Sequence, residues 1–156
     1  MADTNSEPGT RDHGSAPGLL SGLRVIEFAD ETAEYCGLML AGLGADVTKI
    51  EEPGGSPTRK IAPFHRDEPG PDSSLYFWAY NRGKRSVVVD FQKPSERDSL
   101  LARIADADIL LDGSNGALND LLGMRRDELA ARFPSLVVAR ITPFGDDGPW
   151  AGFKGS

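Results

Sequence analysis

A β-rich segment, a helical segment and a second β-rich segment follow one another within about thirty residues, and this order limits the fold more than any other feature. Residues 23–28 alternate polar and apolar side chains, as a strand does. Residues 33–43 contain good helix formers, and Gly44 follows them as a C-terminal cap. Residues 46–51 are then a second strand. This order predicts parallel strands joined by a right-handed crossover.

The same alternation of strands and helices continues to the end of the chain. Such a pattern indicates a doubly wound α/β fold, here a Rossmann-like, mostly parallel sheet of about five strands with flanking helices. The Pro- and Gly-rich residues 52–72 are expected to form a loop, and residues 1–18 a disordered tail, which leaves residues 19–156 as one domain. The remaining expected elements are helical turns at 73–80, a buried strand at 86–89, a helix at 94–105, a strand at 108–112, helices at 117–122 and 127–133, and a strand at 136–141.

Composition excludes several classes of protein. The formal net charge of −7 argues against nucleic-acid binding, which needs an excess of clustered Lys and Arg. One cysteine, Cys36, rules out an internal disulfide and fits a reducing compartment. No apolar stretch approaches the ~20 residues of a membrane span, and the N-terminus lacks the pattern of a secretory signal. We therefore expect a cytoplasmic protein that binds neither nucleic acid nor membrane.

The segment 75–90 is the most distinctive, because aromatic residues, a basic turn and a β-branched run follow one another. Arg82, Lys84 and Arg85 make this turn the densest positive spot of an acidic chain. Two interpretations are open. These side chains are solvated surface charges, which composition alone favours, or they clamp an anionic ligand.

Familiar catalytic and cofactor motifs are not found. Gly42 and Gly44 end a helix, whereas a dinucleotide fingerprint follows a strand and opens a helix, so a nicotinamide-binding domain is disfavoured. A helix N-terminus can lower the pKa of a thiol such as that of Cys36, but a buried structural cysteine is the favoured interpretation. Trp78 and Trp150 are expected to be packing residues.

Polar clusters also have simple explanations. Asp30, Glu31 and Glu34 gather where the first helix begins, and interaction with the helix dipole accounts for them without catalysis. No spacing of His, Cys or acidic residues suits a metal ligand set, and no metal is expected. From the residues alone, the chain is an α/β domain with a candidate site for an anionic ligand.

From residue 19 onward, the sequence resembles the N-terminal part of class III CoA-transferases, the CaiB/BaiF family. Several short pieces in the same order and spacing carry the resemblance. They are LSGLRVIEF at 20–28, AGLGADVTKIE at 41–51, PGGSPTR at 53–59, LYF at 75–77, NRGKRSV at 81–87, ADILLD at 107–112 and ITPFGDDGPW at 141–150.

The resemblance implies a Rossmann-like large domain that carries coenzyme A across the carboxyl ends of its strands, and an interlocked homodimer. In this family an aspartate carboxylate attacks an acyl-CoA thioester, and CoA finally passes to an acceptor carboxylic acid; racemases of the same family move a proton instead. That aspartate lies C-terminal to the segment resembling residues 149–156. We therefore assign no catalytic residue to this chain and expect it to be inactive alone. The alternative is a non-catalytic module that binds CoA or depends on a partner.

The resemblance also implies individual CoA contacts. Departures weaken this transfer, since Glu52 stands where some members have an arginine near CoA. Lys84 and Arg85 match family positions, but their ligand role is argued from charge, and a structural role of residues 81–85 at the start of the third strand is supported equally. The expected CoA-binding residues are Thr32, Ala33, Lys84, Arg85, Val89 and Lys154.

Overall fold

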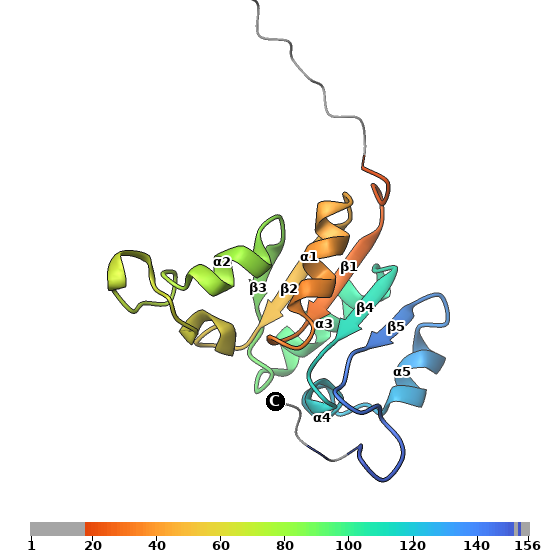
Figure 1. The fold of residues 1–156 in the computed structure, drawn as a ribbon. Coiled ribbons are helices and arrows are strands. Elements are labelled where there is room, and N and C mark those ends of the chain that lie inside the picture. Colours follow the sequence, from red (N-terminus) through yellow and green to blue (C-terminus); the bar gives the residue numbers. More distant parts are fainter. Residues whose placement is uncertain (1–17, 152, 154–156) are drawn as a thin grey trace, which may run out of the picture.

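The computed structural model describes residues 18–151 and 153 and contains a parallel sheet of five strands in the order β3-β2-β1-β4-β5 (Figure 1). This arrangement confirms the expected α/β fold. The order reverses between β1 and β4, so the two halves of the chain extend the sheet in opposite directions from the first strand. The strands are β1 (Arg24–Phe28), β2 (Asp46–Glu51), β3 (Arg85–Val88), β4 (Ile109–Asp112) and β5 (Val137–Arg140).

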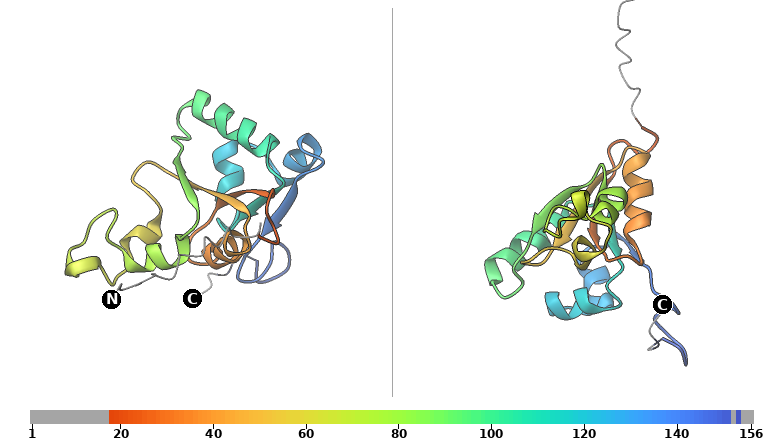
Figure 2. Two further views of the ribbon diagram at one scale, coloured as in Figure 1. Left: turned by 90° about the horizontal axis from the view of Figure 1, so that it is seen from above. Right: turned by 60° about the vertical axis from the view of Figure 1, so that its left-hand side comes forward.

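Helices cover both faces of the sheet, with α1 on one side and α3, α4 and α5 on the other (Figure 2). Helix α2 and the loop after β2 extend from the β3 edge (Figure 1). The helices are α1 (Glu34–Gly42), α2 (Leu75–Asn81), α3 (Pro94–Ala105), α4 (Ala117–Leu122) and α5 (Arg126–Arg132), and two short 3₁₀ turns are η1 (Pro57–Lys60) and η2 (His65–Asp67).

The helix signals in the sequence correspond to observed features. Pro94 opens α3, and Gly44 follows α1 with a φ of 100°, a left-handed conformation that glycine adopts without strain. Most predicted elements agree with the observed bounds to within a residue or two, as is usual for helix and strand ends. Most of the predicted tail, residues 1–17, lies outside the described residues.

Side chains alternate between the two faces of each strand, and this places the core. Ile26, Ile50 and Leu110 pack against α3, α4 and α5. Val25 and Val47 lie on the opposite face, toward α1. On that second face, the next inward positions of β1 and β2 carry Glu27 and Lys49, so the α1 side of these two strands becomes polar toward their carboxyl ends.

The prediction that the third strand is buried was wrong. β3 is an edge strand, paired with β2 alone among the described strands, and Val88 is 57% exposed. Three consecutive valines therefore indicate a strand without saying whether it lies at the centre of the sheet. Val89 lies just beyond β3 and is buried.

The two tryptophans also differ from expectation, because they are 45% exposed at Trp78 and 61% exposed at Trp150. Trp78 Nε1 donates to the carbonyl of Asp72 at 3.1 Å, and the ring of Trp150 meets that of Phe144 edge-to-face. They cover surface loops instead of filling the core. Across residues 18–151 and 153, none of the helices has the length and apolar character that crossing a bilayer requires.

A candidate site at the carboxyl ends of the strands

A pocket of about 190 Å³ opens where β1, β2 and β4 end. Residues 28–30 form its first wall, at the end of β1 and in the turn that follows. Residues 50–52 and 55–57 form the second wall, and Ser114 with Ala117 the third. The site lies where the strand order reverses, the position at which open α/β sheets bind their ligands.

The pocket has an acidic lining. Asp30, Glu51 and Glu52 are its ionisable residues, and neither Lys nor Arg is among the described residues that line it. Asp30 also organises the turn, since its Oδ1 accepts a hydrogen bond of 3.0 Å from the Thr32 amide. Such a lining favours an uncharged or hydrogen-donating part of a ligand over a phosphate group.

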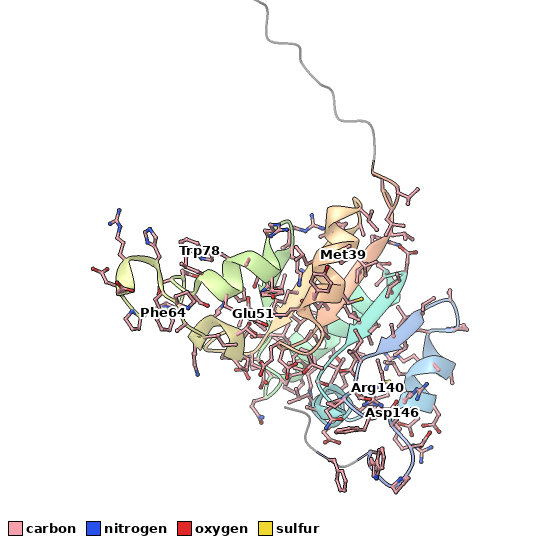
Figure 3. The ribbon with its side chains drawn as sticks, viewed as in Figure 1. Met39, Glu51, Phe64, Trp78, Arg140 and Asp146 are labelled. Atoms are coloured by element: carbon pink, nitrogen blue, oxygen red, sulfur yellow. The ribbon has the colours of Figure 1, made fainter. Side chains whose placement is uncertain are left out.

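Glu51 lies at the end of β2 (Figure 3), and both oxygens of its buried carboxylate accept hydrogen bonds. Arg59 donates from Nε to Oε2 at 2.6 Å and from Nη2 to Oε1 at 2.8 Å. The Ser56 amide donates to Oε2 at 2.7 Å, and the Ser86 hydroxyl donates to Oε1. Burial alone would raise the pKa of Glu51, but these hydrogen bonds and the Arg59 charge outweigh it and lower the pKa to about 2. Glu51 is therefore a fixed anion that anchors the loop after β2.

Beneath the first wall lies a buried charge network of two carboxylates and two ammonium groups, made by Glu27, Glu34, Lys49 and Lys84. Lys49 Nζ lies 2.7 Å from Glu34 Oε1 and 3.4 Å from Glu27 Oε1. Lys84 Nζ lies 2.8 Å from Glu27 Oε2. The four side chains are almost completely buried, and their formal charges cancel.

Burial dominates the electrostatics of this network. It raises the pKa of Glu27 against the opposing charges of Lys49 and Lys84. It lowers the pKa of Lys84 against the opposing pull of Glu27. These groups are removed from water and depend on one another for stabilisation.

A third ion cluster lies beside the pocket, where β4 and β5 end (Figure 3). Arg140, at the end of β5, lies 3.2 Å from the buried Asp112 and 3.1 Å from Asp146. Asp112 also accepts a hydrogen bond of 2.9 Å from the amide of Ser114, which lines the pocket. The turn after β4 is thus held at the edge of the site. Within the described residues, no group of three or more His, Cys, Asp or Glu is arranged to hold a metal ion.

Sequence comparison matches residues 20–156 to CoA-transferase family III. The chain belongs to this family. A succinyl-CoA:(R)-benzylsuccinate CoA-transferase subunit of Thauera aromatica is 38% identical over 136 residues, which are 87% of this chain and 33% of that protein. A succinate–glutarate CoA-transferase of Agrobacterium fabrum is 39% identical over 140 residues, 87% of this chain and 35% of that protein. The chain spans about a third of the length of these relatives.

Solved structures agree with this assignment. A CaiB/BaiF family protein from Brucella suis superposes with a TM-score of 0.78 at 35% identity, over 90% of this chain and 37% of that one. The Rv3272 protein of Mycobacterium tuberculosis superposes with a TM-score of 0.75 at 34% identity, over 90% and 38%. The resemblance found in the sequence is confirmed.

In this member of CoA-transferase family III, the predicted CoA-binding residues lie in different places. Thr32 and Ala33 belong to the turn that continues from Asp30, but they do not line the pocket. The Ala33 amide donates to the Asp30 carbonyl at 3.2 Å. Val89 is in the core, and its amide donates to the Glu51 carbonyl at 2.8 Å. Lys154 lies outside the described residues.

The basic turn lies where β3 begins, at the amino end of that strand, whereas the pocket lies at the carboxyl ends of β1, β2 and β4. Arg85 pairs with Asp46, the first residue of β2. Lys84 points inward and belongs to the buried charge network. Arg82 donates to the carbonyl of Ala79 at 3.1 Å. These contacts account for the turn as the start of β3, while ligand contact by Lys84 or Arg85 remains a prediction.

Sequence reasoning missed the buried charge network. Glu34 was explained by the helix dipole alone, yet it is the only carboxylate of its group that is fully buried. The available signal was in the strands. Glu27 and Lys49 occupy inward positions on their strands and face each other in the β1–β2 register. Opposite charges at paired inward positions of two apolar strands indicate a buried ion pair.

Cys36 is half-buried beside the apolar cluster under α1. Burial, followed by the Glu27 charge, raises the pKa of its thiol. The structural interpretation is thereby favoured over an activated thiolate.

Proposed function

We propose that this chain supplies the CoA-binding part of a CoA-transferase that moves CoA between an acyl-CoA and a carboxylic acid. The observation that carries the proposal is the pocket at the carboxyl ends of β1, β2 and β4, in a chain of CoA-transferase family III. The named activities of the Thauera and Agrobacterium relatives support the same substrate classes.

The pocket fits an uncharged part of CoA. Its volume of about 190 Å³ is smaller than a typical small-molecule site of ~300–1,000 Å³, so it accommodates only a portion of so large a ligand. The carboxylates of Asp30 and Glu52 repel phosphate groups, whereas Arg59 balances the charge of Glu51. We propose that the adenosine or pantetheine portion enters the pocket while the diphosphate stays in solvent.

Calorimetric titration of the purified chain with CoA tests this proposal, with NADH as the control ligand. Ala117 is exposed, lines the pocket and opens α4, so Ala117→Phe should fill the pocket without disturbing the core. Ala130→Phe is the matched control, because Ala130 is an exposed alanine on α5 outside the pocket. We expect CoA binding that Ala117→Phe abolishes and Ala130→Phe preserves. No effect of Ala117→Phe on CoA binding would contradict the proposed site. Binding of NADH, which shares the adenosine diphosphate of CoA, would identify adenosine as the portion that enters the pocket.

We further propose that residues 1–156 bind CoA without turnover, because none of them matches the aspartate that, by the family resemblance, attacks the thioester. Incubation with an acyl-CoA and an acceptor acid tests this directly. Transfer, or a covalent acyl adduct seen by mass spectrometry, would disprove it.

We also propose that the protein forms a homodimer and is located in the cytoplasm. Exposed apolar side chains such as Tyr35, Met39 and Val137 provide surface that a second copy can cover. The single cysteine fits a reducing compartment. Light scattering of the purified chain measures its assembly state, and a monomer at all concentrations would oppose dimerisation.

A further inference from the structure

We propose that the buried charge network, together with Thr58, is a positioning device that fixes the first wall of the pocket against the second. The inference deepens the proposed function, on which its ligand-binding consequence rests. The network joins two segments that are distant in sequence, the β1–α1 turn at residues 29–34 and the loop after β2 at residues 55–58.

Lys49 contacts the β1–α1 turn at both ends. Its ammonium donates to the carbonyl of Ala29 at 2.6 Å and lies 2.7 Å from the carboxylate of Glu34. Ala29 lines the pocket, and Glu34 is the first residue of α1. One buried cation therefore fixes the span of the turn that carries Asp30.

Lys84 makes a third contact with the same turn. Its ammonium donates to the backbone carbonyl of Glu34 at 2.9 Å and to Glu27 Oε1 at 2.9 Å. A third donation, of 3.1 Å, goes to Asn81 Oδ1. All three N–H groups of the ammonium are thus used, and the beginning of α1 is tied to β1 and α2.

Thr58 connects this assembly to the second wall. Its hydroxyl donates to Glu34 Oε1 at 2.7 Å, and the hydroxyls of Thr58 and Ser56 lie 2.8 Å apart. Ser56 lines the pocket and is itself held by Glu51. A continuous path of contacts, buried from Lys49 onward, therefore runs from Ala29 through Lys49, Glu34 and Thr58 to Ser56.

Positioning explains these residues better than stability does. Glu27, Glu34, Lys49 and Thr58 are buried, yet none of them lines the pocket. Apolar residues of similar volume are often at least as stabilising as a buried ion pair. A charged network instead imposes directional bonds on two backbone segments, and such supporting contacts hold a binding site in its productive geometry.

Thr58→Val tests the link with little change in shape, and Thr58→Ser restores the hydroxyl. Hydrogen exchange by mass spectrometry is followed in residues 29–34 and 55–59, with residues 137–140 of β5 as the distant reference. In Thr58→Val we expect about tenfold faster exchange in residues 29–34 and 55–59, because roughly one buried hydrogen bond is lost. Exchange in β5 should be unchanged. Thr58→Ser should exchange like the wild type. Unchanged exchange at 29–34, or equal acceleration in all segments, would overturn the inference.

Affinity for CoA gives the second readout. We expect Thr58→Val to weaken binding about tenfold and Thr58→Ser to restore it, although Thr58 does not line the pocket. Unaltered affinity in Thr58→Val overturns the positioning role. If the wild type does not bind CoA, the proposed function fails, while the exchange experiment still decides whether the two walls are coupled.

A measurement on the wild type covers the case in which Thr58→Val does not fold. Native-state exchange at rising denaturant should show residues 29–34 and 55–59 opening in one event, with the same denaturant dependence. Independent opening of the two segments would contradict the inference.

Discussion

Gly37 lies directly against the carboxylate of Glu27, because a Cβ atom at residue 37 would come within 1.6 Å of Glu27 Oε2. The same Cβ would be 3.1 Å from Lys84 Nζ. A helix can therefore cover this buried ion pair only where it carries no side chain. Glycine at this place in α1 is required by the charge beneath it.

Gly37→Ala should destabilise the protein although alanine is the better helix former. The carboxylate cannot move away without losing Lys49 and Lys84, so we expect a loss of about 3 kcal/mol in the free energy of unfolding, at the upper end of overpacking effects. Gly42→Ala is the matched control in the same helix, since a Cβ there meets nothing within 4 Å. Replacing that glycine should change stability by no more than the ~1 kcal/mol gained from helix propensity.

Urea denaturation of the two variants measures both effects. Equal stability of Gly37→Ala and Gly42→Ala would show that the Glu27 carboxylate does not lie beneath α1.

Glu51 should make stability depend on pH in the acid range. Its pKa is lowered from 4.5 to about 2 in the folded protein. The folded state therefore favours the charged form, so this contribution is complete above the unfolded pKa and is lost as the pH falls toward 2. The stability difference between wild type and Glu51→Gln should shrink from about pH 5 to about pH 2.5.

Urea denaturation at several pH values checks this prediction. Glu52→Gln is the matched control, because Glu52 is the adjacent carboxyl, just after the end of β2, and is exposed. If the difference in the free energy of unfolding between wild type and Glu51→Gln stays constant across this pH range, the lowered pKa of Glu51 is excluded.

Arg140 should matter more for stability than an arginine on the surface. Arg140→Met leaves the buried Asp112 without its cation, and we expect a loss of about 3 kcal/mol, the lower end for a broken buried pair because Arg140 is partly exposed. Arg24→Met is the control, since Arg24 pairs with Asp108 at 3.9 Å on the surface. Arg24→Met should lower the free energy of unfolding by only about 0–1 kcal/mol. Similar losses in the two variants, measured by thermal or urea unfolding, would refute the special role of Arg140.

The fold was predictable because its signals are local. Strand periodicity, Pro94 at a helix start and Gly44 after a helix end each depend on a few neighbouring residues. The edge position of β3 was not predictable in this way, since three valines pack equally well at the centre or the edge of a sheet. Strand order depends on contacts between segments distant in sequence.

The location of the candidate site agrees with the sequence analysis, while the individual CoA contacts stay predictions. Ligands at the carboxyl ends of the strands follow from the fold class, and the pocket is found there. The basic turn was a candidate ligand site because the sequence shows which residues are charged but not which are buried. Lys84 and Glu34 are charged residues whose partners come from distant segments, and the structure shows them inside the protein.

The thiol of Cys36 should react slowly in the folded protein. Burial and the nearby charge of Glu27 raise its pKa, and the thiolate is the reactive form of cysteine. Because Cys36 is the only cysteine of the chain, a thiol-specific reagent reports on it without background. At pH 8 we expect modification to be slower in the native protein than in the same protein unfolded in urea, because the raised pKa lowers the thiolate fraction and burial restricts access of the reagent. The absorbance released by the reagent gives both rates. A native rate equal to or above the unfolded rate would mean that the start of α1 activates the thiol, and the structural assignment of Cys36 would have to be abandoned.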